Sequence, residues 1–263
     1  MILTNHNSPG VMTSKRLKFP NPDSLKLSAF LDLPESGSPK AFALFAHCFT
    51  CGKNLKPIVN INKALTMHGI AVLRFDFTGI GESEGTFTET NFSSTVADLT
   101  AAAQYLGKEY EAPKLLIGHS MGGAAVLQAA RHISSVKALV TIAAPSNPNH
   151  LSGILREKRN EVKSEGTAEV TIGGKTFTLT RQFFEDLEST KMEGFIRNLN
   201  RPLLILHAPD DDTVDIENAA EIFQMAKHPK SYISLDDTGH LILREQDARY
   251  AGNLIAAWVE RYL

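Results

Sequence analysis

Two segments of the sequence match the pattern G-x-S-x-G, in which a serine stands between two glycines. Residues 118–122 read GHSMG, and residues 81–85 read GESEG. A serine hydroxyl becomes a nucleophile when a neighbouring base removes its proton, and it must project where a substrate can reach it. Each segment therefore indicates covalent catalysis. Ser120 and Ser83 are distinguished by the residues on either side of them.

The surroundings of Ser120 are those of a nucleophile elbow, in which a strand runs into a helix through a strained turn. The apolar run LLI at residues 115–117 precedes it. The small residues GGAAVL at 122–127 follow it and begin a helix that can pack close to a sheet. The positive end of this helix also favours a developing anion. Ser120 is therefore the predicted nucleophile.

The surroundings of Ser83 fit neither catalysis nor nucleotide binding. The sequence TFT that follows is not a helix start, and Glu82 and Glu84 would repel an oxyanion. The glycines at residues 79–85 have one residue too many for the dinucleotide-binding pattern G-x-G-x-x-G, and no helix opens among them. Ser83 is predicted to be a polar loop residue.

A base and an acid for Ser120 follow later in the chain. The apolar run LLIL leads into HAPDDDTV, which holds Asp210, Asp211 and Asp212, and a further run leads into DDTGHL, which holds His240. In such a site the histidine accepts the serine proton, and an acid orients the imidazole ring and stabilises its protonated form. Three separate strand-end signals therefore predict a serine, histidine and aspartate site. The order of the residues leaves the choice among the three aspartates open.

The elements that would position these residues alternate along the chain. Continuous apolar runs are typical of parallel strands covered on both faces, and helical patterns lie between them. Such alternation predicts βαβ units and an α/β fold with a parallel sheet. The predicted strands are residues 42–46, 70–75, 115–117, 136–142, 203–206 and 232–235. Apolar residues share one helical face in two segments, which are Val96, Leu99, Ala103 and Leu106, and then Ala251, Leu254, Ile255 and Trp258.

One region, between about residues 147 and 200, interrupts this alternation. It has a helical pattern, then AEVTIGGKTFTLT, then RQFFEDLEST. With Gly173 and Gly174 as a two-residue turn, the middle piece is predicted to form a hairpin. An insertion between two core strands lies over the carboxyl ends of the strands, where parallel sheets bind ligands. We therefore expect one domain over residues 1–263 with a small cap at about 147–200. The predicted hairpin pairs are Ile172 with Lys175, Val170 with Phe177 and Ala168 with Leu179.

Five stretches carry a resemblance to a known family: HCFTCGKN, AVLRFDFTGIGESEG, TNFSS, LLIGHSMGGAAVLQAA and HPKSYISLDDTGHL. With the order of serine, acid and histidine, they make the chain similar to the α/β-hydrolase superfamily from Phe42 to Leu263. More narrowly, the chain resembles the hydrolase half of proteins that fuse such a domain to an osmotically inducible protein C domain. That second domain is not among these 263 residues. The resemblance implies the α/β-hydrolase fold: a mostly parallel central sheet with helices on both faces and a small cap insertion containing a β-hairpin.

The resemblance also assigns the remaining site residues. In the superfamily the acid is the last residue of a G-x-x-D segment after its strand, which corresponds to Asp211, although Ala208 replaces the glycine. Asp210 and Asp212 remain alternatives. The family's oxyanion hole uses the backbone N–H of the residue after the nucleophile and a second N–H from an H-G-x loop. These positions correspond to Met121 and Phe49, and Cys48 replaces the loop glycine.

Composition excludes several classes of protein. The formal net charge of the 263 residues is -2 with no run of like charges, so we expect neither nucleic acid nor a membrane as a partner. No long apolar segment and no secretory leader is visible, which predicts a cytoplasmic protein. No histidine cluster has metal-ligand spacing, so neither a metal nor another cofactor is expected. His47 and His207, at strand ends, are expected to hydrogen-bond to loop backbone. The oligomeric state is not predicted.

The function that these residues predict is that of a serine hydrolase. The favoured hypothesis is a carboxylesterase that acts on small soluble esters through an acyl-enzyme, with Ser120, His240 and Asp211 as a triad. A thioesterase, amidase or acyltransferase would use the same residues, and a non-catalytic ligand-binding protein is the rival class. The cysteines, Cys48 and Cys51, are too close in sequence to join distant elements. They are interpreted either as two reduced loop residues or as a redox-responsive pair.

Overall fold

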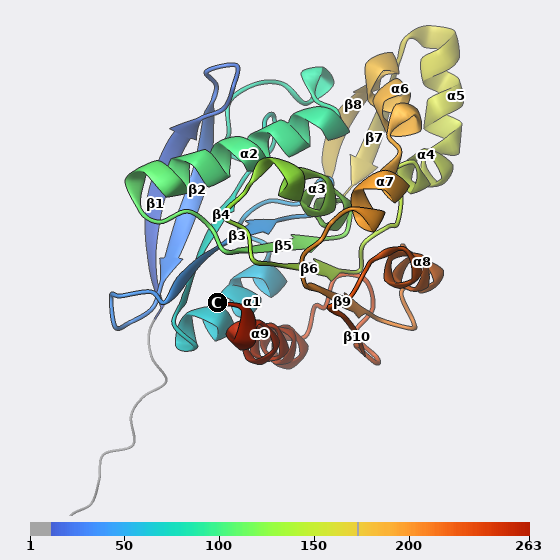
Figure 1. Ribbon diagram of the computed structural model, residues 1–263. Coiled ribbons are helices and arrows are strands. Elements are labelled where there is room, and N and C mark those ends of the chain that lie inside the picture. Colours follow the sequence, from blue (N-terminus) through green and yellow to red (C-terminus); the bar gives the residue numbers. More distant parts are fainter. Residues whose placement is uncertain (1–11, 173) are drawn as a thin grey trace, which may run out of the picture.

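The sheet at the centre of the molecule has eight strands, in the order β1-β2-β4-β3-β5-β6-β9-β10 (Figure 1). The computed structural model describes residues 12–172 and 174–263. Strand β2 pairs antiparallel with both β1 and β4, and the neighbouring pairs from β4 to β10 are parallel. This mostly parallel sheet confirms the predicted α/β architecture. The strands are β1 (Thr13–Pro20), β2 (Lys26–Leu33), β3 (Ala41–Ala46), β4 (Ile70–Phe75), β5 (Leu115–His119), β6 (Ala138–Ile142), β9 (Leu203–His207) and β10 (Lys230–Ser234).

Helices cover both faces of the sheet (Figure 1). Every residue of β3, β4, β5, β6 and β9 is buried, which explains why these strands read as continuous apolar runs. Successive side chains point to opposite faces, so Leu44 packs in the core under α2 and α3 while Phe45 packs in the core with α1 and α9. These helices and the remaining ones outside the cap are α1 (Lys56–Met67), α2 (Phe92–Glu109), α3 (Met121–Ala129), α8 (Glu217–Met225) and α9 (Glu245–Val259), with short 3₁₀ turns at Phe87–Glu89, Ala130–His132 and Glu260–Tyr262.

All six predicted strands are present, with ends shifted by a few residues at most. The sequence reading missed β1 and β2, which form the antiparallel edge of the sheet. Lysines and serines interrupt both strands, so neither reads as a continuous apolar run, although Phe19, Leu27 and Leu31 are fully buried. Within the part of the chain that the structure describes, no helix combines the length and apolar character needed to cross a membrane.

The segment between β6 and β9 contains the predicted hairpin. Strands β7 and β8 pair antiparallel with the expected partners, Ile172 with Lys175 and Val170 with Phe177. Gly173, in the predicted turn, lies outside the described residues. Helix α6 joins this segment to the main core through Phe183 and Leu187. The elements of this segment, called the cap from here on, are α4 (His150–Ile154), α5 (Arg156–Glu165), β7 (Thr167–Ile172), β8 (Lys175–Thr180), α6 (Arg181–Ser189) and α7 (Met192–Arg197).

Small residues let β5 and α3 approach their neighbours closely. A Cβ atom on Gly122 would stand 2.3 Å from the carbonyl oxygen of Ala46, and one on Gly123 would stand 2.4 Å from the Cβ of Ala144. Neither position has room for a methyl group, because real Cβ atoms do not approach other heavy atoms this closely. The glycines at 122 and 123 are therefore required by the packing of α3 against the sheet.

We expect Gly122→Ala to lower the free energy of unfolding by about 1–3 kcal/mol, because the added methyl group overpacks the contact between α3 and β3. Gly153→Ala is the matched control, since a Cβ there meets no atom within 4 Å and the residue lies in α4. The control should leave stability unchanged or raise it by up to about 1 kcal/mol. Urea unfolding of both variants measures the difference, and equal stability of Gly122→Ala and the wild type would contradict the packing argument.

Candidate active site

Ser120 lies in a sharp turn between β5 and α3. Its backbone has φ 55° and ψ −126°, a region that residues with a side chain rarely adopt. The turn is fixed at both sides, because the N–H of Ser120 donates to the carbonyl of Ile142 at 2.8 Å and the N–H of Gly123 donates to the carbonyl of Ser120 at 2.8 Å. The local sequence thus produces the strand, strained turn and helix expected of a nucleophile elbow.

His240 and Asp211 complete a chain of hydrogen bonds that begins at Ser120. The Oγ of Ser120 is 3.0 Å from Nε2 of His240. On the other side of the ring, Nδ1 of His240 is 2.9 Å from Oδ2 and 3.1 Å from Oδ1 of Asp211. A carboxylate only accepts, so Nδ1 carries the proton and Nε2 is free to accept from the serine hydroxyl. The structure therefore brings together the three side chains that sequence order had placed at separate strand ends.

Asp211 differs from its two acidic neighbours in burial and in hydrogen bonding. Its side chain is buried after β9, whereas Asp210 and Asp212 are exposed. The backbone N–H groups of Thr213 and Val214 donate to its Oδ1 at 2.9 and 2.8 Å. Burial alone would raise the pKa of the Asp211 carboxyl, but hydrogen bonds from histidine side chains and from the Val214 N–H outweigh it. The pKa of Asp211 is consequently held well below its usual range, and the group stays ionised.

His207 is a neighbour of Asp211 whose position the sequence did not indicate. Its buried Nε2 donates to the carbonyl oxygen of Val214 at 2.7 Å, which confirms the expected bond to loop backbone. The same nitrogen lies 3.4 Å from Oδ2 of Asp211. The spacing of four residues between a strand-end histidine and the acid is the signal that could have suggested this contact. His207 thus holds both the loop and the carboxylate.

His119 contacts the backbone of His240. Its Nε2 donates to the backbone carbonyl oxygen of His240 at 2.8 Å, and the ring is buried. Burial, reinforced by the neighbouring His240 ring, lowers the pKa of His119 to about 4. His119 is therefore neutral near pH 7, with its proton on Nε2. The sequence reading placed His119 beside the elbow but gave it no partner, because the loop of His240 lies 121 residues away.

The two residues predicted to supply oxyanion-hole N–H groups line the same cavity as the serine. Met121 is the first residue of α3, and both Met121 and Phe49 line one cavity together with Ser120. The Phe49 ring packs against Phe87 and Phe183, with ring centroids 5.4 and 5.2 Å apart, so the cap helix α6 holds this loop.

Cys48 and Cys51 are joined by a disulfide, with their Cα atoms 5.3 Å apart. A disulfide here is compatible with the interpretation of a redox-responsive pair, which stays a prediction, as does the alternative of two thiols that remain reduced. Residues 48–51 form a tight turn around Phe49. The N–H of Cys51 donates to the carbonyl of Cys48 at 3.3 Å across this turn. The sequence could not decide this, since C-x-x-C spacing suits thiols and disulfides alike.

Ser83 has the structural role expected of a loop serine. Its hydroxyl donates to the carbonyl of Asp76 at 2.6 Å and accepts the N–H of Ser28 at 2.9 Å. Glu82, next to it, pairs with the buried ammonium group of Lys53 at 2.7 Å. Ser83 thus anchors a loop to β2, and within the described part of the chain no histidine bonds to it.

A cavity of about 710 Å³ opens above Ser120 and His240. The loop at residues 48–55 forms one wall, and the cap forms the other. The cap contributes mostly apolar side chains, which are Leu151, Ile154, Leu155, Val170 and Ile172. A cavity of this size and character suits a small organic ligand.

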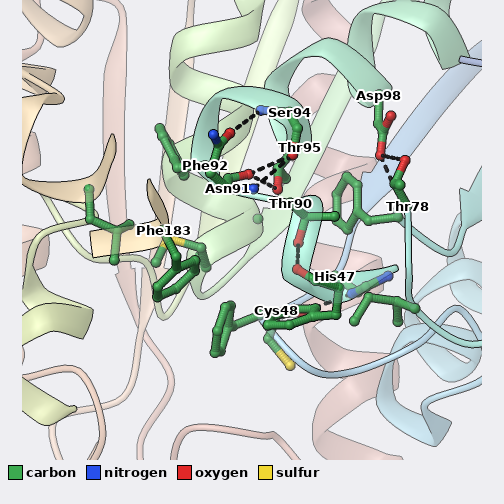
Figure 2. A pocket seen from close by; sticks show the side chains of 17 residues that line it. His47, Cys48, Thr78, Thr90, Asn91, Phe92, Ser94, Thr95, Asp98 and Phe183 are labelled. Carbon is green, nitrogen blue, oxygen red and sulfur yellow. Dashed lines mark hydrogen bonds between the residues drawn. The ribbon is translucent and has the colours of Figure 1, made fainter. Parts of the chain in front are cut away.

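A second, much smaller cavity of about 30 Å³ lies behind the loop that carries Cys48 and Phe49 (Figure 2). Cys48, Phe49 and Met121 line both cavities and so separate them. Figure 2 shows Asp98 bonded to Thr78 at its edge, with Oδ2 accepting from the backbone N–H at 2.9 Å. Burial raises the pKa of Asp98, and this hydrogen bond opposes the shift. The small cavity has room for a water-sized group and not for a substrate.

No cluster of three histidine, cysteine, aspartate or glutamate side chains suited to a metal ion occurs among residues 12–172 and 174–263.

Comparison with known proteins identifies similar hydrolases. The model of the family described as serine aminopeptidase, S33, matches residues 38–164. The esterase domain of a Rhodothermus marinus protein is 47% identical, with a TM-score of 0.79 over 95% of this chain and 99% of that one. Est1E from Butyrivibrio proteoclasticus, solved with ferulic acid, shares the fold at 20% identity and a TM-score of 0.76, over 93% of this chain and 98% of that one.

Curated relatives are more distant in sequence. The mitochondrial palmitoyl-protein thioesterase ABHD10 of Mus musculus is 25% identical over 68% of this chain and 61% of its own length. The monoglyceride lipase of Rattus norvegicus is 30% identical over 46% of this chain and 35% of its own length. The chain thus spans less than two thirds of the length of these relatives.

The neutral, buried state of His119 predicts how stability depends on pH. Between pH 6.5 and about 4 the unfolded chain binds a proton at this residue and the folded chain does not. The free energy of unfolding should therefore fall as the pH falls through this window, by up to about 3 kcal/mol from His119. Urea unfolding across this pH range measures the slope. His119→Gln keeps an N–H donor for His240 but does not titrate, so its slope should be shallower than that of the wild type.

His68→Gln, at an exposed histidine, is the matched control and should reproduce the wild-type slope. A slope for His119→Gln as steep as that of the wild type would show that His119 does not contribute.

Proposed function

Because the chain belongs to the α/β-hydrolase superfamily and is an ester hydrolase, we propose that it is a carboxylesterase that works through an acyl-enzyme on Ser120. The observation that carries this proposal is the hydrogen-bonded chain from the Ser120 hydroxyl through His240 to the Asp211 carboxylate, at 3.0 and 2.9 Å. Each contact has the length of a normal hydrogen bond, and the strained turn presents the hydroxyl to the cavity.

In the first half of the reaction, Ser120 Oγ attacks the ester carbonyl carbon while its proton passes to Nε2 of His240. The positive ring that results is stabilised by the Asp211 carboxylate, which stays ionised because its pKa is held low. The backbone N–H groups of Met121 and Phe49 donate to the oxyanion of the tetrahedral intermediate. His240 then gives its proton to the departing alcohol, and the acyl group remains on Ser120.

In the second half, a water molecule takes the place of the alcohol. His240 removes a proton from it, the hydroxide attacks the acyl-enzyme, and the carboxylic acid leaves as Ser120 regains its proton. No metal or cofactor takes part in this scheme.

The cap changes our expectation of the substrate. The sequence favoured small soluble esters because no apolar lid was evident, but the cap presents a largely apolar wall to the cavity. We therefore propose small-molecule esters that carry an apolar chain, taken from the cytoplasm, with neither nucleic acid nor a membrane as a partner. Kinship with the hydrolase half of osmotically inducible protein C fusion proteins remains a prediction.

Thioester hydrolysis is the second candidate. The similarity to a palmitoyl-protein thioesterase favours it, and the same residues would attack a thioester carbonyl. Amide hydrolysis, acyl transfer and a non-catalytic role in ligand binding are the remaining alternatives. Labelling with a fluorophosphonate separates catalysis from binding alone, because only an activated serine reacts. Parallel series of esters and thioesters of equal chain length separate the first two candidates.

We expect Ser120→Ala and His240→Ala each to lower kcat by up to about 10⁶-fold, because either change removes the activated nucleophile. Ser83→Ala is the matched control, since it removes a hydroxyl from the other G-x-S-x-G segment. It should retain near wild-type kcat and fluorophosphonate labelling. A folded Ser83→Ala protein as inactive as Ser120→Ala would contradict the assignment of Ser120 as the nucleophile.

Among the three consecutive acids, we expect Asp211→Asn to lower kcat by up to about 10⁴-fold, because the imidazole loses its orienting carboxylate. Asp210→Asn and Asp212→Asn change exposed side chains and should have much smaller effects. The kcat values of the three single variants test this order. A largest loss at position 210 or 212 would refute the role proposed for Asp211.

A further inference from the structure

Lys175 lies on the apolar face of the cap hairpin. Side chains alternate along β8, so Lys175 shares a face with Phe177 and Leu179, both of which are buried. Its register partner on β7 is Ile172. The opposite face of β8 carries threonines, which are Thr176, Thr178 and Thr180. Lys175 is itself exposed, and it therefore stands at the outer end of a row whose inner members, Phe177 and Leu179, are buried.

This row leads into the cavity above Ser120. Lys175 lines that cavity beside Ile172 and Val170, and the same cavity contains Ser120 and His240. Among the described residues that line it, there is no aspartate or glutamate, and Lys175 is the single lysine or arginine. The cavity is thus apolar with one cation, although the whole chain carries more acids than bases, 29 against 27.

Some cations of the cap are paired and others are not: Lys175, like Arg156, Lys163, Arg181 and Lys191, has no ion pair among the described residues, and it differs from these four in lining the cavity. Lys158, Arg159 and Arg197 each pair with a glutamate of the cap, at 2.8, 2.5 and 2.7 Å. Within the described ranges, no carboxylate lies within 4.0 Å of the Lys175 ammonium group. Lys175 is exposed, so its ammonium group keeps its hydration, and it stands at the edge of the apolar surface, where it can pair with an anion on a ligand.

We propose that Lys175 is a specificity-determining residue that selects esters carrying an anionic group separated from the ester bond by an apolar chain. The proposal rests on the esterase function proposed above. The apolar walls accept methylene groups, whereas an anion placed against those walls would lose its hydration without compensation. At Lys175 the anion instead gains a charge-assisted hydrogen bond. The substrate class is thus an amphiphilic monoester, such as the monoester of a dicarboxylic acid.

The length of the apolar chain decides whether the anionic group reaches Lys175 while the ester bond lies at Ser120. Each methylene group that packs on the apolar wall should raise kcat/KM by about fourfold. The anionic group adds its own gain only when the chain is long enough to reach Lys175. The preference for an anionic over a neutral ester should therefore peak at one chain length.

Two series of esters test the proposal. The first consists of mono-4-nitrophenyl esters of dicarboxylic acids, and the second of 4-nitrophenyl esters of monocarboxylic acids with the same number of carbons. We expect the anionic-to-neutral ratio of kcat/KM to peak at one length and to fall about threefold to tenfold in Lys175→Ala. Lys175→Glu should lower the ratio further, and Lys175→Arg should retain it.

A third series places the anion on the alcohol, as acetate esters of ω-hydroxy carboxylic acids. A Lys175-dependent preference in this series, and not in the first, would show that the alcohol side of the substrate reaches the lysine. Lys163→Ala, at an exposed lysine of α5 away from the cavity, is the matched control and should leave all ratios unchanged.

The proposal is overturned if Lys175→Ala lowers kcat/KM for anionic and neutral esters equally, or if none of the ratios depends on Lys175. Binding of the same esters to Ser120→Ala, measured by calorimetry, separates this failure from failure of the esterase function. If the wild type hydrolyses neither anionic nor neutral esters, the proposed function fails. A Lys175-dependent binding preference would still support the selectivity, and its absence would overturn it.

Discussion

The hydrogen bond between Asp211 and His240 depends on loops that follow different strands meeting at one edge of the sheet. Asp211 follows β9, His240 follows β10, and Ser120 follows β5, so the parallel arrangement of these strands is what brings the three side chains into contact. The contact is then fixed by groups around it. His207 and two backbone N–H groups hold the carboxylate, and His119 holds the backbone of His240.

The sequence was sufficient for the parts of the site that depend on local structure. The strand, glycine and helix signals around Ser120 predicted the elbow, because that turn is determined by its immediate neighbours. The choice among the three aspartates was harder, because they are consecutive in the chain and carry the same charge. They differ in burial, which depends on the tertiary structure. The partner of His119 and the contact of His207 with Asp211 were missed for the same reason. Strands β1 and β2 were missed because their mixed polar and apolar residues form no continuous run.

The pairing of the cap hairpin was predicted from the sequence, but its position relative to the cavity was not. The pairing of Ile172 with Lys175 follows from the sequence and is present in the structure. The sequence did not indicate, however, that this face of the hairpin opens into the cavity of Ser120. Once that placement is known, the apolar side chains of the cap become a wall for a substrate chain, and the lysine among them becomes a group for selecting charge.

Trapping the acyl-enzyme shows whether Ser120 is the nucleophile. Wild-type protein is mixed with an excess of a 4-nitrophenyl ester, quenched with acid within the first turnovers, digested and mapped by mass spectrometry. We expect an acyl group on the peptide that carries Ser120, formed with a burst of 4-nitrophenol. An acyl group on a different residue, or repeated turnover without acylation of any residue, would contradict it.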